Sequence, residues 1–559
     1  MYTQDFDPVS DSLGLTAIFA VLPVLTLFVL LGGFRMKAQW AALISLAVAM
    51  LVAAIVYGMP AGQTLLSASE GATFGLFPIM WIVIAAIWVY NMTVETGHFA
   101  VLRRSFGAIS DDQRVQAVIV AFCFGALLEA LAGFGTPVAI TAVMLIALGF
   151  QPMKAAAVAL VANTAPVAFG AIATPIITLA EVTELPKDDL GAMVGRQTPV
   201  LALIVPLILV FMVDGRRGVR QVWPVAVLGG VSFAVGQFLC ANYFSVELTD
   251  IVAALLATAS IVAFLRVWSP SEPLLGDGDG RFTQPAVAGG STHSPELERE
   301  IARRDDGQRD SAGDVAKAYA PYAIIIAVFS IAQIPAVKDA LAESPWTTTF
   351  EWPGLDVVTP DGEPLSSLTF NFNWLPATGT LMLISGLITM GVLGVSPGRA
   401  LETFTKTLDQ LKWAILTVAA VLGLAYVMNQ SGQTVTLGLW AAGAGGFFAF
   451  LSALIGWLGV AVTGSDTSSN ALFGALQVTA AEDAGISKTL LAAANSSGGV
   501  LGKMISPQNL AIGAAAVGLA GKEGDLFRKV LGWSLVLVLL MCVLVYLQST
   551  PVLDWMVVE

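Results

Sequence analysis

Residues 456–477 read GWLGVAVTGSDTSSNALFGALQ, an apolar run that is interrupted by polar and small residues from Thr463 to Asn470. Apolar sequence on both sides is typical of a membrane helix. Hydroxyls, a carboxylate and a glycine at membrane depth are tolerated only where the backbone is buried in protein or lines a cavity. The stretch therefore predicts a helix that breaks partway across the bilayer, and it assigns the chain to the all-α, polytopic membrane proteins.

The composition supports this fold class. Of the 559 residues, 56% are hydrophobic and only 12% are charged, whereas soluble domains are usually about 25% charged. A bilayer core needs about 20 apolar residues per helix, and the apolar runs predict roughly twelve to fourteen membrane segments. These runs are continuous, which excludes the short alternating strands of a lipid-facing barrel. The net charge of −13 argues against nucleic-acid binding.

Loop charges predict the orientation in the membrane. Basic residues mark the cytoplasmic side of a membrane protein. They cluster in alternate loops, as at Arg103, Arg104 and Lys522, while the loops between them are acidic or neutral. The pattern predicts a multi-pass protein with both termini outside.

Two polar segments stand apart from the membrane sequence. Residues 269–316 are rich in Gly, Pro and mixed charge, which is typical of disordered linkers. They predict a cytoplasmic linker between two membrane halves, 1–268 and 317–559. A second segment, about 338–373, lies outside by the same charge pattern. It either folds over an entrance or is an ordinary ordered loop, and the sequence favours the second reading.

Two long apolar stretches, about 114–180 and 434–520, cross the predicted membrane in opposite senses. They also match at constant spacing: Asn163, Gly170, Thr174 and Pro175 correspond to Asn495, Gly502, Ser506 and Pro507. The first stretch has an interruption of its own, GFGTP at 133–137. Similar segments in opposite orientation predict an inverted-topology repeat with broken or re-entrant helices.

The two interruptions form the candidate substrate site. A broken helix exposes amide N–H groups at a new N-terminus, whose dipole attracts anions. Facing each other near the midplane, the two breaks suit a small carboxylate that carries a neighbouring hydroxyl. The alternative is that their small residues only permit close helix packing. The predicted substrate-binding residues of the two breaks are Gly133, Gly135, Thr136, Thr463, Gly464, Ser465, Thr467, Ser468, Ser469 and Asn470.

Asn163 and Asn495 mark a second pair of helix breaks. Each asparagine stands beside small or helix-breaking residues, in NTAP and NSSGG respectively. Their amides either bind substrate or hydrogen-bond the backbone carbonyls that the breaks release. Both readings remain open, and both residues belong to the predicted substrate site.

Three charged residues lie within apolar sequence, where each costs about 2.5–3.5 kcal/mol on insertion scales. Glu129 stands in a run of Leu and Ala, and a buried carboxyl of this kind can carry a proton. Asp466 could carry the proton, bind a cation or hold amides of the break. Lys503 could pair with the substrate carboxylate, or structurally with Asp466 or Glu129.

Enzyme chemistry finds little support in the sequence. The chain has two histidines, His98 near a helix end and His293 in the polar linker. A Ser-His-Asp triad or a His-rich metal site is therefore not predicted. No catalytic residue, metal or cofactor is assigned. Cys123, Cys240 and Cys542 fall in apolar runs, so no disulfide framework is implied.

Five stretches resemble the L-lactate permease family. They are FCFGALLEALAGFGTPVAITA (122–142), NTAPVAFGA (163–171), MVGRQ (193–197), GWLGVAVTGSDTSSNALFGALQ (456–477) and GKMISPQ (502–508). The resemblance extends over nearly the whole chain. It implies proton symport of L-lactate, with D-lactate or glycolate as alternative substrates, across the bacterial cytoplasmic membrane. It also implies paired hairpins, inverted repeats and an elevator-like movement.

The partners that follow are a small 2-hydroxy monocarboxylate, a proton and membrane lipid. The resemblance places Glu129, 133–137, Asn163, 463–470, Asn495 and Lys503 in matching motifs, without saying which of them touches substrate. Two rival readings are sodium-coupled uptake of a related carboxylate, with Asp466 binding the cation, and an anion channel.

Overall fold

Long apolar helices make up most of the computed structural model, which describes residues 1–34, 36–133, 135–274, 310–332, 334–365, 368–519 and 522–558. The fold class is as predicted. Nine helices or helix runs of the described part are long and apolar enough to cross a membrane. A tenth is the pair Pro152–Ala162 and Val167–Thr183, if its 66° bend lies within one span.

The N-terminal elements lead into the first long apolar stretch. They are α1 (Leu13–Ala20), α2 (Leu22–Phe28), η1 (Val29–Gly33), α3 (Ala38–Ile55), α4 (Ala61–Phe74), η2 (Gly75–Met80), α5 (Trp81–Glu95) and α6 (His98–Gly107). The stretch itself forms α7 (Gln113–Gln116), η3 (Ala117–Phe124), α8 (Gly125–Ala132), α9 (Thr136–Ala147), α10 (Pro152–Ala162), η4 (Val167–Phe169) and α11 (Gly170–Thr183). Helices α12 (Lys187–Tyr243) and α13 (Thr249–Leu265) follow.

The C-terminal part has the same character. It comprises α15 (Ala312–Ala332), α16 (Pro335–Ala342), α17 (Thr378–Val392), α18 (Pro397–Gln430), α19 (Gln433–Ala442), η6 (Gly445–Phe447), α20 (Phe448–Thr463), α21 (Asp466–Ala484), α22 (Lys488–Gly502), η7 (Lys503–Ile505), α23 (Pro507–Ala516), α24 (Glu523–Gln548) and η8 (Asp554–Met556). Residues 275–309, most of the predicted linker, lie outside the described residues. The division of the chain into two halves and the inverted repeat stay predictions.

Helix α12 has 57 residues, which would measure about 85 Å if it were straight. A bilayer core is about 30 Å thick. The helix is interrupted at Asp214 and Gly215, whose φ and ψ are not helical, so it holds two spans. The described residues also contain three shorter apolar helices, α9, α13 and α17.

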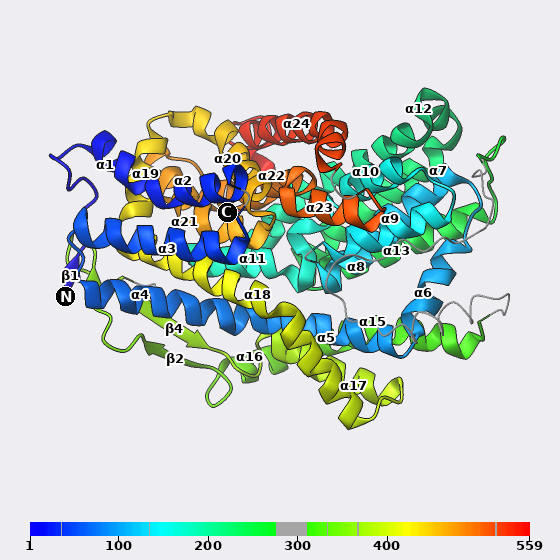
Figure 1. Ribbon diagram of the computed structural model, residues 1–559, viewed down its shortest axis with the longest axis horizontal. Helices are drawn as coiled ribbons and strands as arrows, with labels where there is room; N and C mark the ends of the chain where they lie inside the picture. Colours follow the sequence, from blue (N-terminus) through cyan, green and yellow to red (C-terminus); the bar gives the residue numbers. More distant parts are fainter. Residues whose placement is uncertain are drawn as a thin grey trace.

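Glycine allows α20 and α22 to pack directly backbone to backbone. A Cβ at Gly456 would lie 1.9 Å from the carbonyl oxygen of Asn495, and one at Gly498 would lie 2.1 Å from that of Ala453. Small residues permit such close approach within membranes. The same region joins sequence-distant parts, because α11 packs against α21 and α12 against α22; Figure 1 shows α11, α21 and α22 near the middle of the molecule.

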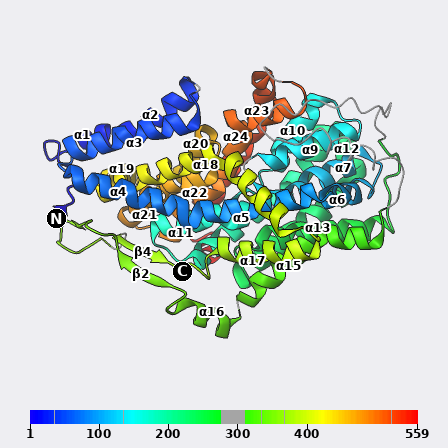
Figure 2. The same cartoon turned by 60° about the horizontal axis from the view of Figure 1, so that its bottom comes forward.

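The predicted outer segment is ordered. β2 (Thr348–Glu351) pairs antiparallel with β4 (Thr369–Phe372), and β3 (Val357–Val358) pairs in parallel with β1 (Tyr2–Thr3) at the start of the chain. Figure 2 shows β2, β4 and α16 together on the side opposite α1 and α2. Residues of β4 help to line a cavity of about 250 Å³ with the acids Glu70, Glu181 and Glu184.

Candidate functional site

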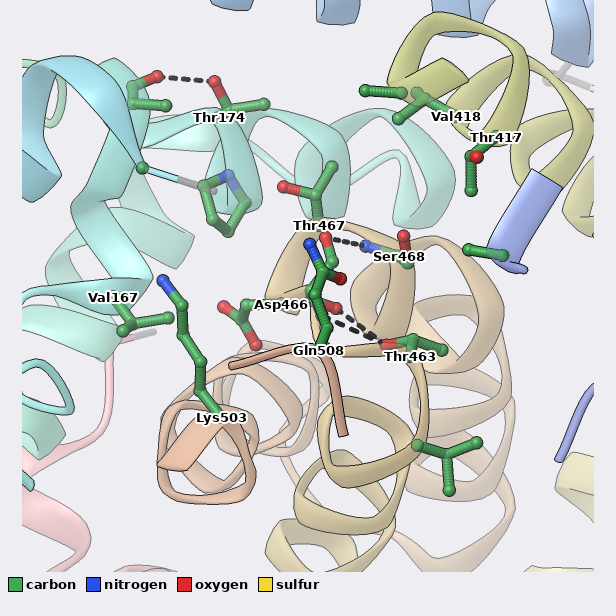
Figure 3. Close-up of a pocket in the computed structure, with 18 of the residues that line it drawn as sticks. Val167, Thr174, Thr417, Val418, Thr463, Asp466, Thr467, Ser468, Lys503 and Gln508 are labelled. Atoms are coloured by element: carbon green, nitrogen blue, oxygen red, sulfur yellow. Dashed lines mark hydrogen bonds between the residues drawn. The ribbon is translucent and has the colours of Figure 1, made fainter. Parts of the chain in front are cut away.

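A cavity of about 430 Å³ lies where the two long apolar stretches meet. Small ligand sites are commonly concavities of this size, with a few polar groups set in apolar walls. Figure 3 shows side chains of this cavity. Its lining includes Glu129, Gly133, Val167, Gly170, Ala171, Thr174, Pro175, Trp413, Thr417, Val418, Thr463, Gly464, Ser465, Asp466, Thr467, Ser468, Lys503, Pro507 and Gln508.

The second interruption forms one wall of the cavity. Helix α20 ends at Thr463, Gly464 adopts a left-handed conformation with φ of 77°, and Ser465 caps the new helix α21. The Ser465 hydroxyl accepts a hydrogen bond from the backbone N–H of Ser468 at 3.3 Å. The break in the helix is thus where the sequence predicts it, and its residues 463–468 line the cavity.

The first interruption contributes less. Helix α8 ends at Ala132, and Gly133 lines the cavity. Gly135 has φ of 86°, and a Cβ there would lie 2.4 Å from Cδ1 of Ile512, so this glycine faces α23. Thr136 is half-buried at the start of α9 and is not among the lining residues.

Glu129 and Lys503 form a buried ion pair on the cavity wall. The Lys503 ammonium lies 2.6 Å from Oε1 of Glu129, and the two residues are 6% and 2% exposed. The Asn163 amide donates to Oε2 of Glu129 at 2.9 Å. Of the three partners considered for Lys503, the one that it contacts in the structure is Glu129. Asn163 binds the same carboxylate.

Glycine keeps room for this carboxylate. A Cβ at Gly170 would lie 2.8 Å from Oε1 of Glu129, and one at Gly133 would lie 3.2 Å from the same atom. The contact at Gly170 is too close for a Cβ, and the contact at Gly133 is tight enough that the carboxylate would have to shift slightly. The matched Gly170 of the first stretch therefore serves the ion pair directly.

Asp466 begins α21 and faces the same cavity as Lys503 (Figure 3). It is 3% exposed. The Ser496 hydroxyl donates to its Oδ2 at 2.5 Å, while its buried Oδ1 has no hydrogen-bond partner among the described residues. A buried oxygen without a donor is uncommon in native proteins.

Three predicted residues lie in helix contacts instead of the cavity lining. The Asn495 amide donates to Oδ1 of Asn470 at 2.9 Å, and the Asn470 amide donates to the Pro175 carbonyl at 3.0 Å. The Ser469 hydroxyl donates to the Gly456 carbonyl at 3.2 Å. These contacts join α11, α20, α21 and α22 behind the cavity.

The sequence does not predict a left-handed turn that lies at the cavity wall. Ala171, Ile172 and Ala173 have φ of 44°, 56° and 57°, although none is a glycine. Left-handed backbone costs L-residues about 1–2 kcal/mol each. The Thr174 hydroxyl donates to the Ala171 carbonyl at 2.5 Å and closes the turn. The sequence GAIATP contains no signal for this conformation.

Asp250 is a second buried feature that the sequence does not single out. It is fully buried in the first turn of α13. The Gln237 amide donates to its Oδ1 at 3.1 Å and to the Ala165 carbonyl at 3.3 Å. Asp250 stands at the edge of the apolar sequence of α13, and nothing in the sequence indicates that its carboxyl is buried.

Known proteins resemble this chain along its full length. Residues 16–552 match the family described as L-lactate permease. An L-lactate permease of Bacillus subtilis is 41% identical over 100% of both chains, and the glycolate permease GlcA of Escherichia coli is 40% identical over 98% of each.

Solved structures that resemble it include the YdaH transporter of Alcanivorax borkumensis, with a TM-score of 0.44 at 14% identity over 86% of both chains. Another is MtrF of Neisseria gonorrhoeae, with a TM-score of 0.46 at 14% identity over 88% of this chain and 84% of that one. On the match over residues 16–552 and the full-length relatives at about 40% identity, the chain belongs to the L-lactate permease family.

Proposed function

We propose that this protein takes up L-lactate, and with it D-lactate or glycolate, by proton symport across the bacterial cytoplasmic membrane. The names of its relatives support the substrate class. The observation that carries the proposal is the Glu129–Lys503 ion pair on the wall of a cavity large enough for a small carboxylate.

A buried cation needs a nearby anion, and a buried anion needs a cation. When a substrate carboxylate binds Lys503, it takes the place of Glu129. The Glu129 carboxylate is then left without a cation in a buried wall of the cavity, where an uncompensated charge is costly. Binding of one anion therefore promotes binding of one proton at Glu129.

This exchange keeps the charge of the site constant. Apart from Asp466, which is unchanged by this exchange, the empty site holds one ammonium and one carboxylate of its own. The loaded site holds the ammonium, the substrate carboxylate and a neutral Glu129. A carrier whose charge does not change can reorient in both states without moving net charge through the membrane, which makes transport electroneutral. Asp466, on the same wall, remains the second candidate for the proton.

The test is uptake of labelled L-lactate into proteoliposomes under an inward proton gradient, with and without a protonophore. Symport predicts accumulation that collapses with the protonophore and persists when choline replaces sodium. Accumulation that needs sodium would assign the coupling to sodium instead. Equilibration without accumulation would indicate a channel.

The Glu129→Gln variant separates coupling from binding. It mimics the neutral carboxyl, so lactate exchange across the vesicle membrane should continue while proton-driven accumulation is lost. Asp466→Asn is the matched variant on the same wall, and it should retain accumulation if Glu129 is the carrier. Accumulation by Glu129→Gln at the wild-type level would remove Glu129 from the coupling step.

A further inference from the structure

Two hydroxyl side chains of the larger cavity have no partner among the described residues. They belong to Thr467 and Ser468, in the first turn of α21. Neither side-chain oxygen is among the fully buried atoms that lack a hydrogen bond, so each retains some accessible surface. The two residues are otherwise enclosed, at 7% and 6% exposed. The accessible part of each hydroxyl therefore opens into the cavity that both residues line.

The other hydroxyl side chains of the cavity lining are already engaged. Each of them hydrogen-bonds a nearby backbone group, and the residues are Thr174, Thr417, Thr463 and Ser465. Such local bonds are usual for Ser and Thr in helices and at helix caps. Thr467 and Ser468 differ because their hydroxyls remain available to a ligand, both as donors and as acceptors.

Asp466 precedes this pair of hydroxyls and holds the start of α21 against α22. The Ser496 hydroxyl donates to its Oδ2 at 2.5 Å, and a Cβ at position 499 would lie 2.3 Å from its Oδ1. Both carboxyl oxygens thus lie against α22. Asp466 is also close enough to Lys503 for the two charges to interact, which places the first turn of α21 near the lysine (Figure 3).

Two glutamines of the cavity lining also have side chains without a hydrogen bond to the described residues. Gln508 is exposed, whereas Gln39 is only 7% exposed. Gln39 belongs to α3, which packs against α18, so it lines the part of the wall that these two helices form. It is the alternative recognition group that an experiment has to separate from Thr467 and Ser468.

A 2-hydroxy monocarboxylate carries two groups that suit this arrangement. Its carboxylate suits the Lys503 ammonium, and the hydroxyl on the adjacent carbon can both donate and accept a hydrogen bond. One protein hydroxyl can accept from the substrate hydroxyl while the other donates to it. A ligand without the 2-hydroxyl would cover Thr467 and Ser468 with apolar atoms and leave their hydroxyls buried without a partner, which is unfavourable.

We propose that the hydroxyls of Thr467 and Ser468 recognise the 2-hydroxyl of the substrate while Lys503 holds its carboxylate. The inference rests on the proposed transport function and assigns its specificity to the first turn of α21. A hydrogen bond between neutral groups corresponds to about twofold to tenfold in affinity. With both bonds formed, L-lactate should bind about fivefold to a hundredfold more tightly than propionate, which lacks only the hydroxyl.

The experiment measures how well unlabelled L-lactate and propionate compete with labelled L-lactate in exchange across proteoliposomes at equal pH on both sides. Exchange needs no net proton movement, so it reports recognition apart from coupling. In the wild-type protein L-lactate should compete about fivefold to a hundredfold better than propionate. The double variant Thr467→Val, Ser468→Ala should bring the two competitors close together, because it weakens the binding of lactate and not that of propionate.

Single variants and a stability measurement keep the test decisive. Thr467→Val and Ser468→Ala should each remove part of the preference, which covers the case that the double variant fails to fold. Because neither hydroxyl bonds another described residue, these variants should not lower the unfolding temperature. A purely structural role would instead lower the unfolding temperature and leave the preference for lactate intact.

Two control variants change other side chains of the cavity lining. Thr417→Val makes the same substitution at a hydroxyl that already donates to the Trp413 carbonyl. Gln39→Leu removes the amide on the side of α3. Both variants should keep the wild-type preference for L-lactate over propionate.

The inference is overturned if L-lactate and propionate compete equally in the wild type, or if either control loses the preference as fully as the double variant. A full preference in the folded double variant, or in both single variants where the double variant does not fold, also overturns it. Failure of the proposed function is a separate result, because it would appear as absent proton-driven lactate accumulation in the wild type. If lactate accumulates with protons and the preference persists without the two hydroxyls, only this inference fails.

Discussion

A lysine enclosed by protein is stable only beside a negative charge, and in this protein the charge belongs to Glu129. The two side chains come from η7 and α8, which are far apart in the sequence. Because both are nearly dry, loss of either one leaves an uncompensated charge, whereas loss of both leaves none. The contribution of the pair to stability can therefore be measured separately from its proposed role in transport.

We expect Lys503→Met to lower the free energy of unfolding by about 3–5 kcal/mol, because Glu129 is left without its cation. The double variant Glu129→Gln, Lys503→Met should recover most of that loss but should not accumulate lactate. Thermal unfolding in detergent, with uptake in proteoliposomes, measures both. An equal loss of stability in the single and double variants would contradict the pairing.

Gly170 gives a finer probe of the same pair. A Cβ there would meet Oε1 of Glu129 at 2.8 Å, so Gly170→Ala should displace the carboxylate and reduce proton-driven uptake. Gly62→Ala is the matched control, since nothing lies within 4 Å of a Cβ at that position in α4. Uptake rates at equal amounts of folded protein compare the two. Similar rates would mean that the carboxylate tolerates displacement.

At the scale of an element, the start of α11 is a short left-handed turn that runs against the preference of its residues. Ala171 to Ala173 are non-glycine, yet they share positive φ values. Such backbone persists only when the surrounding contacts hold it. Because Ala171 lines the larger cavity, the strained backbone forms part of the candidate site.

Ala173→Gly should therefore leave the free energy of unfolding unchanged or raise it by about 1 kcal/mol, because glycine adopts positive φ without penalty. Ala157→Gly is the control in the ordinary helix α10, where the same change should cost about 1 kcal/mol. Both alanines are buried. Denaturation of the two variants side by side tests the turn, and equal destabilisation would argue against the left-handed conformation.

At the scale of the whole molecule, one buried arginine joins segments that the sequence separates widely. Arg114 pairs with Asp112 at 2.6 Å and with Asp214 at 3.1 Å, and it donates to the Glu272 carbonyl. It thereby connects the start of α7, the interruption in α12 and the described first residues of the predicted linker. Burial alone raises the pKa of the Asp112 carboxyl, but the hydrogen bonds and charge of Arg114, together with the hydrogen bond from the Leu274 N–H, outweigh burial and hold that pKa below its ordinary value.

A carboxyl with a depressed pKa in the folded state contributes stability above its unfolded pKa of about 3.9, and this contribution is lost as the pH falls through the folded pKa. Asp112→Asn should thus lower the unfolding temperature at about pH 7, and the difference from the wild type should shrink toward strongly acidic pH. Asp409→Asn, which removes an exposed partner of Lys412, should change little at either pH. A pH-independent difference for Asp112→Asn would contradict the role of its charge.

The sequence predicts the helix class and the break between Thr463 and Ser465, because polar residues within apolar runs carry their own physical signal. It also selects Glu129, Asp466 and Lys503 as special, because charge at membrane depth is costly. It does not predict which of them pair, why Asn495 bonds Asn470, or that Asp250 is enclosed. Those facts depend on how helices distant in the sequence approach one another.

Helix α11 contributes Pro175 to the larger cavity and Glu181 to the acidic one, and these positions are about 9 Å apart along a helix. The same helix thus lines both cavities, the larger one at Pro175 and the acidic one at Glu181. A tilt or shift of α11 would therefore change the shape of both cavities together. A small molecule bound beside Glu181 would for the same reason reduce the proposed lactate uptake without occupying the larger cavity.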